Sequence, residues 1–264
     1  MFNFGISTTI TNDRDVFSAI KMIGESSFRF VEIRCEKGHF DYENKEETKK
    51  VETLLKKKSL SCVSLHPPLW VDIANKEEWT RVKSLREVEK VILVAGRLKA
   101  PRVIIHPGKS AGSMQKSIES LNELSEFGKE FDTDIVLENT SPGNLGSKVD
   151  ELRVLSDEFE LPFCVDTSHA SAKEDILNQM LQLFGDRIEH FHLSDSKKKG
   201  SDDHLIPYEG KIVWDPVLEF LKSRKGFAIF EIYPRGESEI IKELEKIIRR
   251  CCYFLLINFK YWRI

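Results

Sequence analysis

The chain has 264 residues, of which 41% are hydrophobic and 31% charged, and its formal net charge is −3. This length fits one large domain or two small ones, and the composition excludes a disordered chain because it supplies enough apolar side chains for a sizeable core. The net charge gives no general attraction to nucleic acid, so contact with phosphates would need local basic patches or bound metal cations.

Cysteine usage and the N-terminus indicate a cytoplasmic protein. The five cysteines are an odd number and include no C-x-x-C pair, which is typical of reduced thiols. The N-terminal residues MFNFGIST lead directly into a strand pattern, without the basic and long apolar regions of a signal peptide. The conspicuously apolar segment 251–264 is too short to span a bilayer as a helix. We therefore expect no membrane partner.

Short apolar, β-branched runs alternate along the chain with longer segments of helical periodicity. In residues 76–98, for example, apolar side chains recur at helical spacings. The strand-like runs lie at residues 4–8, 28–34, 60–66, 102–106, 133–138, 162–166, 188–193 and 227–232. Eight strand–helix units predict a parallel sheet that closes into a single (β/α)₈ TIM barrel. No linker interrupts the series, so we expect one domain at 1–250, followed by an apolar and aromatic tail at 251–264.

Metal-binding types of residue recur on one side of the predicted strand ends. Because alternate residues face opposite sides of a strand, Ile104 and His106 face the barrel axis while Val103 and Ile105 face the helices. The same parity turns inward His66, Glu138, Asp166, His192 and Glu231. His190 also faces inward, one layer below, and is assigned to the core. Catalytic groups of this fold occur at the carboxyl ends of the strands, so we expect the functional site there.

Three more candidates, His169, Asp202 and His204, belong to the local pairs D-x-x-H and D-x-H after the sixth and seventh strands. Imidazoles and carboxylates without thiolates suit zinc, and also manganese or iron. A lone histidine or glutamate at a strand end is more often a core residue or an ion pair. Nine such groups converging on one barrel mouth would be costly to bury unless they shared metal ions. The pattern therefore favours a multinuclear metal site.

The segments SLHPP, IIHPG, VLENTSP, CVDTSHA, FHLSDSK, DDHLIPYEG and FEIYP resemble successive strand-end motifs of the endonuclease IV and xylose-isomerase-like barrel superfamily, also called AP endonuclease family 2. The resemblance spans residues 1 to about 250. It implies up to three zinc ions, or manganese in their place. The implied ligands are His66 and His106 with bridging Glu138 for the first ion, Asp166, His192 and Glu231 completing the second, and His169, Asp202 and His204 for the third.

By this resemblance the chain would hydrolyse duplex DNA at abasic sites. Paired ions lower the pKa of a shared water, which then attacks phosphorus, and Glu138 and Glu231 are the candidate catalytic residues. Trp70 follows the third strand and would contact the DNA. Lys197 and Lys198 lie in the loop after the seventh strand, where they could meet phosphates, although a solvated lysine run is at least as common.

A metal-dependent sugar isomerase or epimerase of the same superfamily is the alternative. Those relatives use a smaller set, matched here by Glu138, Asp166, His192 and Glu231, in which one divalent ion binds a sugar or sugar phosphate and the two glutamates exchange a proton. The loop SDSKKKGSDDHL is shorter than its endonuclease IV counterpart, and Leu69 and Trp70 replace the usual wedge residues. A barrel that binds metal but serves as a scaffold is a third class. The residues thus predict the superfamily and leave the reaction and the oligomeric state open.

Overall fold

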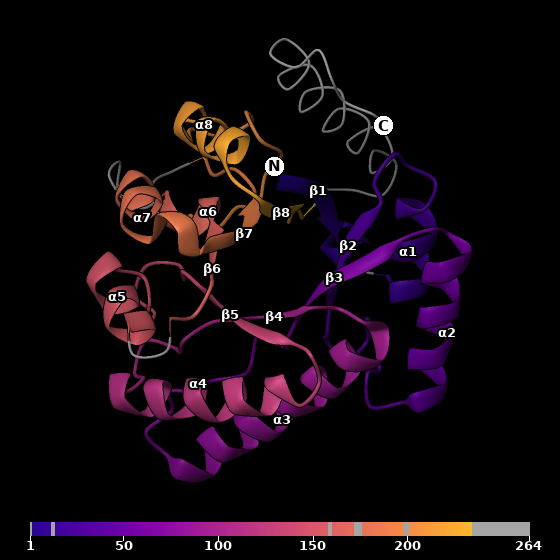
Figure 1. Cartoon of the computed structure of the whole chain (residues 1–264), viewed down its shortest axis with the longest axis horizontal. Helices are drawn as coiled ribbons and strands as arrows, with labels where there is room; N and C mark the ends of the chain where they lie inside the picture. Colours follow the sequence, from indigo (N-terminus) through magenta and orange to yellow (C-terminus); the bar gives the residue numbers. More distant parts are fainter. Residues whose placement is uncertain (1, 12–13, 158–159, 172–175, 198–200, 234–264) are drawn as a thin grey trace.

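The computed structural model describes residues 2–11, 14–157, 160–171, 176–197 and 201–233 (Figure 1). All eight predicted strands are present, pair in parallel in chain order, and close by pairing β8 with β1. The strands are β1 Phe2–Ser7, β2 Phe30–Arg34, β3 Ser61–His66, β4 Arg102–Ile105, β5 Asp134–Glu138, β6 Phe163–Asp166, β7 Ile188–Leu193 and β8 Gly226–Phe230. The predicted (β/α)₈ barrel is therefore confirmed. The predicted segment 234–250 and the tail 251–264 lie outside the described residues.

Helices surround the strands on the outside of the barrel (Figure 1). They are α1 Val16–Ile23, α2 Lys45–Lys57, α3 Glu78–Leu98, α4 Met114–Lys129, α5 Val149–Asp157, α6 Thr167–Ala170, α7 Ile176–Phe184 and α8 Asp215–Ser223, with 3₁₀ turns η1 Thr8–Thr11 and η2 Gly185–Arg187. Capping side chains define several helix starts: Asn44 accepts hydrogen bonds from two main-chain N–H groups of α2, and Ser113 accepts one from α4. Among the helices in these ranges, none is long and apolar enough to cross a membrane.

Two separate apolar layers confirm the predicted strand parity. Val103 and Ile105 belong to the large core between the strands and the helices. Ile104, Val136 and Cys164 form a distinct buried cluster, which consists of the inward residues of three neighbouring strands. Residues two positions further along each strand therefore face the carboxyl-terminal mouth of the barrel.

The opposite, amino-terminal end of the barrel is closed by a contact across its axis. The Arg102 guanidinium, at the start of β4, donates to the carbonyl oxygen of Glu189 in β7 at 2.8 Å and to its carboxylate at 2.5 Å. The same guanidinium lies 5.2 Å from the ring centre of Phe227, which packs against Phe30. These groups lie at the bottom of the barrel, at the end opposite to the mouth.

The cysteines in the described ranges, Cys35, Cys62 and Cys164, are buried and free, as predicted for reduced thiols. Burial raises the pKa of each of these thiols, which keeps them protonated and unreactive. Cys251 and Cys252 lie outside the described residues.

Replacing Ile104 by alanine should lower the free energy of unfolding by about 2–5 kcal/mol, because it opens a cavity inside a closely packed barrel. Chemical denaturation followed by circular dichroism measures the change. Val154→Ala is the control, since Val154 is exposed on α5, and its effect should stay within about 0.5 kcal/mol. Equal effects of the two substitutions would contradict the internal packing of Ile104.

Candidate metal centre

Six inward residues meet at the carboxyl-terminal mouth, as the sequence predicted. His66, Glu138 and Asp166 end their strands, and His192 is the penultimate residue of β7. His106 and Glu231 follow β4 and β8 directly. Side-chain nitrogen and oxygen atoms from these residues and from the adjoining loops form three groups, in each of which the candidate ligand atoms lie within 4.8 Å of one another.

The first group consists of His66, His106 and Glu138. The Nε2 atoms of the two histidines lie 3.4 and 3.1 Å from Glu138 Oε2. His66 Nδ1 lies 2.7 Å from the carbonyl oxygen of Pro67, which can only accept, so Nδ1 carries the proton and the Nε2 lone pair is directed at the group.

The second group consists of Glu138, Asp166, His192 and Glu231. His192 Nδ1 lies 2.8 Å from Glu138 Oε1 and 3.2 Å from Glu231 Oε2. Asn139 braces the end of β6, because its side chain accepts from the Asp166 main-chain N–H and donates to the Asp166 carbonyl oxygen. Glu138 thus belongs to both groups, with one carboxylate oxygen directed at each.

The third group arises from local chain geometry after β6. Asp166 caps α6 by accepting from the His169 N–H at 2.7 Å, which makes D-x-x-H one helical turn and brings both side chains to the mouth. His204 joins them, and Asp202 lies 3.3 Å from His169 Nε2 and 2.9 Å from His204 Nε2. The predicted set of His169, Asp202 and His204 is therefore brought together, and Asp166 stands between the second and third groups.

Buried polar atoms without hydrogen bonds are a second indication that this site fits metal ions. His106 Nε2 and Glu138 Oε2 form an ion pair at 3.1 Å without hydrogen-bond geometry, and neither these two buried atoms nor the buried Asp166 Oδ2 has a hydrogen-bond partner among the described residues. Buried polar atoms are almost always satisfied, and these three point into the groups just described. Mixed imidazole and carboxylate donors suit zinc or manganese.

Charge within the metal-free centre is balanced by imidazoles. Burial would raise the pKa of Glu138, but His192 and His106 hold it well below its usual range. Burial raises the pKa of Asp166 to about 6. Burial would lower the pKa of His204, but the carboxylates of Glu231 and Asp202 raise it to about 9. The centre therefore holds protons near neutral pH that cations could replace.

Two functional candidates were missing from the sequence prediction. Glu32 in β2 is fully buried and contacts His192 Nε2. Its signal in the sequence was a carboxylate at an inward position among the apolar residues Phe30, Val31 and Ile33. Asp195 organises the loop that carries Asp202 and His204, because its carboxylate accepts from the N–H groups of Ser196, Tyr208 and Ile212 and from the Trp214 indole. A Cβ at Gly210 would lie 2.2 Å from Asp195 Oδ1, which explains the glycine of the YEG segment.

The predicted substrate-binding residues occupy different environments. Trp70 is 40% exposed in the loop after β3, beside the more exposed Leu69, and Lys83 lies over its ring. Lys197 is exposed, and its main-chain N–H donates to Asp203. Lys198 lies outside the described residues. Trp214 is buried, and its indole N–H donates to Asp195, so it packs inside the protein and offers no surface to a substrate.

The closed barrel and its mouth of imidazoles and carboxylates define a (β/α)₈ protein with a candidate metal centre. A family profile described as "Xylose isomerase-like TIM barrel" matches residues 17–251. The chain therefore belongs to this family, which confirms the superfamily resemblance of the strand-end motifs.

Similar proteins carry different names. "Uncharacterized protein MJ1614" of Methanocaldococcus jannaschii is 23% identical over 93% of this chain and 99% of its own length. "Probable endonuclease 4" of Acholeplasma laidlawii is 27% identical over 66% of this chain and 69% of its own. A solved D-tagatose 3-epimerase-like protein has a TM-score of 0.84 at 23% identity, covering 97% of this chain and 98% of that one. This structural likeness shows a shared fold and does not identify the reaction.

Metal binding near pH 7 should release protons, because His204 with a pKa of about 9 is protonated in the metal-free centre. The number released per ion should fall as the pH rises through 9. Titration calorimetry with zinc in two buffers of different ionisation enthalpy counts these protons. His204→Asn should release fewer. Heats that are the same in both buffers would contradict the prediction.

Proposed function

We propose that the protein is a multinuclear metal-dependent phosphodiesterase that hydrolyses DNA at abasic sites. The observation that carries the proposal is the presence of three adjoining ligand groups, linked through Glu138 and Asp166. A mononuclear sugar site needs the second group alone. It would leave His66, His106 and the third group gathered at the mouth without a role.

The arrangement of the chain's own residues suits phosphodiester cleavage. Glu138 directs Oε1 toward His192 and Oε2 toward His66 and His106, so its carboxylate spans the first two groups and sets their separation. Asp166 belongs to both the second and the third group. Zinc or manganese ions held there would activate water and neutralise charge on the phosphate and the leaving oxygen.

The name endonuclease 4 carried by a 27%-identical relative supports this choice of substrate. Two features of the rim suit a DNA duplex. Trp70 and Leu69 offer exposed apolar surface after β3, where a wedge could stabilise a flipped nucleotide. Lys197 adds an exposed positive charge after β7.

A sugar isomerase or epimerase is the second candidate, and one contact favours it. Glu138 and Glu231 both approach His192 Nδ1, at 2.8 and 3.2 Å, so two carboxylates flank one point as a proton-exchanging pair requires. In this reaction one divalent ion would bind the sugar oxygens.

Glu138→Gln should reduce cleavage of an abasic-site duplex by at least about 100-fold, because it removes the charge shared by two ligand groups. The measurement is nicking of a labelled duplex with added zinc or manganese, with analysis of the ends for a 3′-hydroxyl. Glu87→Gln is the matched control: Glu87 is also buried but bonds Tyr42 and Lys90, and its substitution should leave nicking intact.

The same preparations decide between the two candidates. Elemental analysis should find more than one ion per chain for the phosphodiesterase. Absence of nicking at high enzyme concentration, together with at most one ion and interconversion of any sugar in a panel of ketoses and sugar phosphates, would replace the proposal with the epimerase. A well-formed metal site with no turnover of either substrate class would indicate a scaffold.

Trp70→Ala should weaken abasic-duplex cleavage mainly through a higher KM, by about 5- to 150-fold, because base–aromatic stacking contributes about 1–3 kcal/mol. Steady-state kinetics at several salt concentrations measures it, and affinity should fall with salt in both proteins. Leu183→Ala is the control, since Leu183 is exposed on α7. An unchanged KM in Trp70→Ala would remove Trp70 from the DNA surface.

A further inference from the structure

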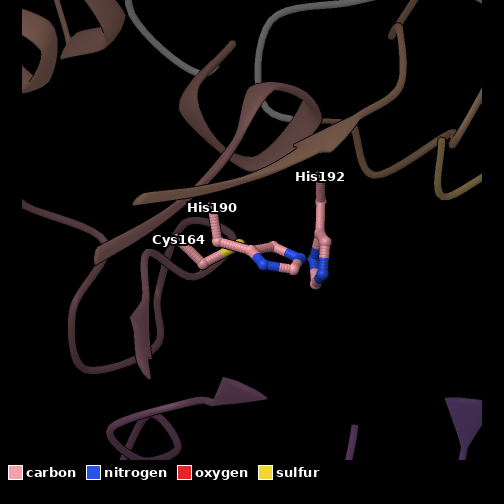
Figure 2. Close-up of side chains that lie close together, drawn as sticks. All are labelled: Cys164, His190 and His192. Atoms are coloured by element: carbon pink, nitrogen blue, oxygen red, sulfur yellow. The ribbon is translucent and has the colours of Figure 1, made fainter. Parts of the chain in front are cut away.

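Directly below the metal centre, the barrel interior holds a second set of polar side chains that the proposed reaction does not use. Glu32, Ser64, Cys164 and His190 come from β2, β3, β6 and β7, and all are buried. They surround the inner edge of His192. We call these four residues the inner polar cluster. Figure 2 shows His190 and Cys164 beside His192, with the His190 ring extending toward the His192 ring.

Glu32 is the acceptor at the centre of this cluster. Its Oε2 accepts from Ser64 Oγ at 2.7 Å and lies 3.1 Å from His192 Nε2 and 3.4 Å from His190 Nε2. Ser64 is the register partner of Glu32 across β2 and β3, so strand pairing itself places the carboxylate. The His190 ring packs edge-on against His192, with centroids 5.4 Å apart and planes at 88°, which restricts rotation of His192.

Three other histidines of the centre are oriented in a different way. His66, His169 and His204 each place Nδ1 against a main-chain carbonyl oxygen, at 2.7, 2.8 and 3.0 Å. A carbonyl oxygen can only accept, so each Nδ1 is protonated and each Nε2 is directed at a ligand group.

His192 is reversed: its Nδ1 faces Glu138 and Glu231, and its Nε2 faces the barrel interior. Glu32 supplies at Nε2 the acceptor that a main-chain carbonyl supplies for the other three histidines.

We propose that Glu32 is a positioning residue for the metal centre: by accepting the Nε2–H of His192, it fixes the tautomer that presents the Nδ1 lone pair to a metal ion. A carboxylate behind a metal-binding imidazole also makes that imidazole a stronger ligand. The inference rests on the proposed metal site, and it holds for either reaction.

A rival use of the same residues is an inner metal site. Candidate ligand atoms of Cys164, His190 and His192 lie within 4.8 Å of one another. Binding there would require His192 to serve two ions through its two nitrogens, and so to lose both ring protons. The 3.1 Å contact between Nε2 and a carboxylate that can only accept favours a proton at Nε2 instead.

The test is metal affinity, measured by competition of cobalt or zinc with a chromophoric chelator. Glu32→Gln should weaken binding of the most tightly held ion by about 10- to 100-fold and alter the visible spectrum of the cobalt-loaded protein. Glu87→Gln, a substitution of the same type at a buried carboxylate away from the mouth, should change neither. Equal affinities of wild type and Glu32→Gln would overturn the proposal.

Nitrogen-15 NMR of histidine in the zinc-loaded wild type provides a readout that needs no Glu32 variant to fold. The expected result is a protonated Nε2 and a metal-bound Nδ1 at His192; a protonated Nδ1 would overturn the assignment. Loss of one ion in Cys164→Ala, with the remaining ions kept, would replace it with the inner metal site. Absence of DNA cleavage would count against the proposed reaction alone, because both measurements follow metal binding.

Discussion

The burial of Glu138 among imidazoles is the constraint on which the rest of the mouth depends. A carboxylate at 0% exposure is costly unless positive charge surrounds it, and here His66, His106 and His192 approach its two oxygens. The same arrangement that compensates this charge in the metal-free protein leaves ligand atoms aimed at two adjoining points. The same side chains can therefore be neutralised by bound protons in the metal-free protein or by bound cations in the metal-loaded protein.

The barrel interior is layered along its axis. Arg102 and Phe227 lie at the bottom, and above them the apolar cluster of Ile104, Val136 and Cys164 and the polar pair of Glu32 and His190 lie in the interior below the mouth. Each layer draws on several strands, because parity brings every second residue to the axis. A substitution in a lower layer can therefore change metal binding without altering a ligand. The change in metal affinity then measures how well the lower layer positions the ligands, and not a role of the substituted residue in the reaction.

Similar proteins are named as a probable endonuclease 4 and as a D-tagatose 3-epimerase-like protein, and both candidate reactions of this chain would use the second ligand group. The two candidate reactions differ in whether they need the other ligand groups that adjoin the second group. His66 and His106 lie on one side of that group, and His169, Asp202 and His204 lie on the other. The proposed phosphodiesterase would use these additional ligand groups to engage several oxygens of a phosphate. In the same proposal Trp70, which is exposed at the rim after β3, would contact the DNA.

The sequence by itself determined the barrel, the strand positions to within two residues and the inward direction of the six strand-end residues, because these follow from periodicities of two and of about 3.6 along a local stretch of chain. Tertiary structure decided how the residues group. That Asp166 adjoins two groups, that Glu32 stands behind His192, and that Asp195 holds the loop bearing His204 depend on strand stagger and loop closure. Such distances join residues as far apart as Glu32 and His192, and no local pattern encodes them. The sequence shows a charged residue, Glu32, at an inward position of its strand. Only the closed barrel shows that its partner is His192.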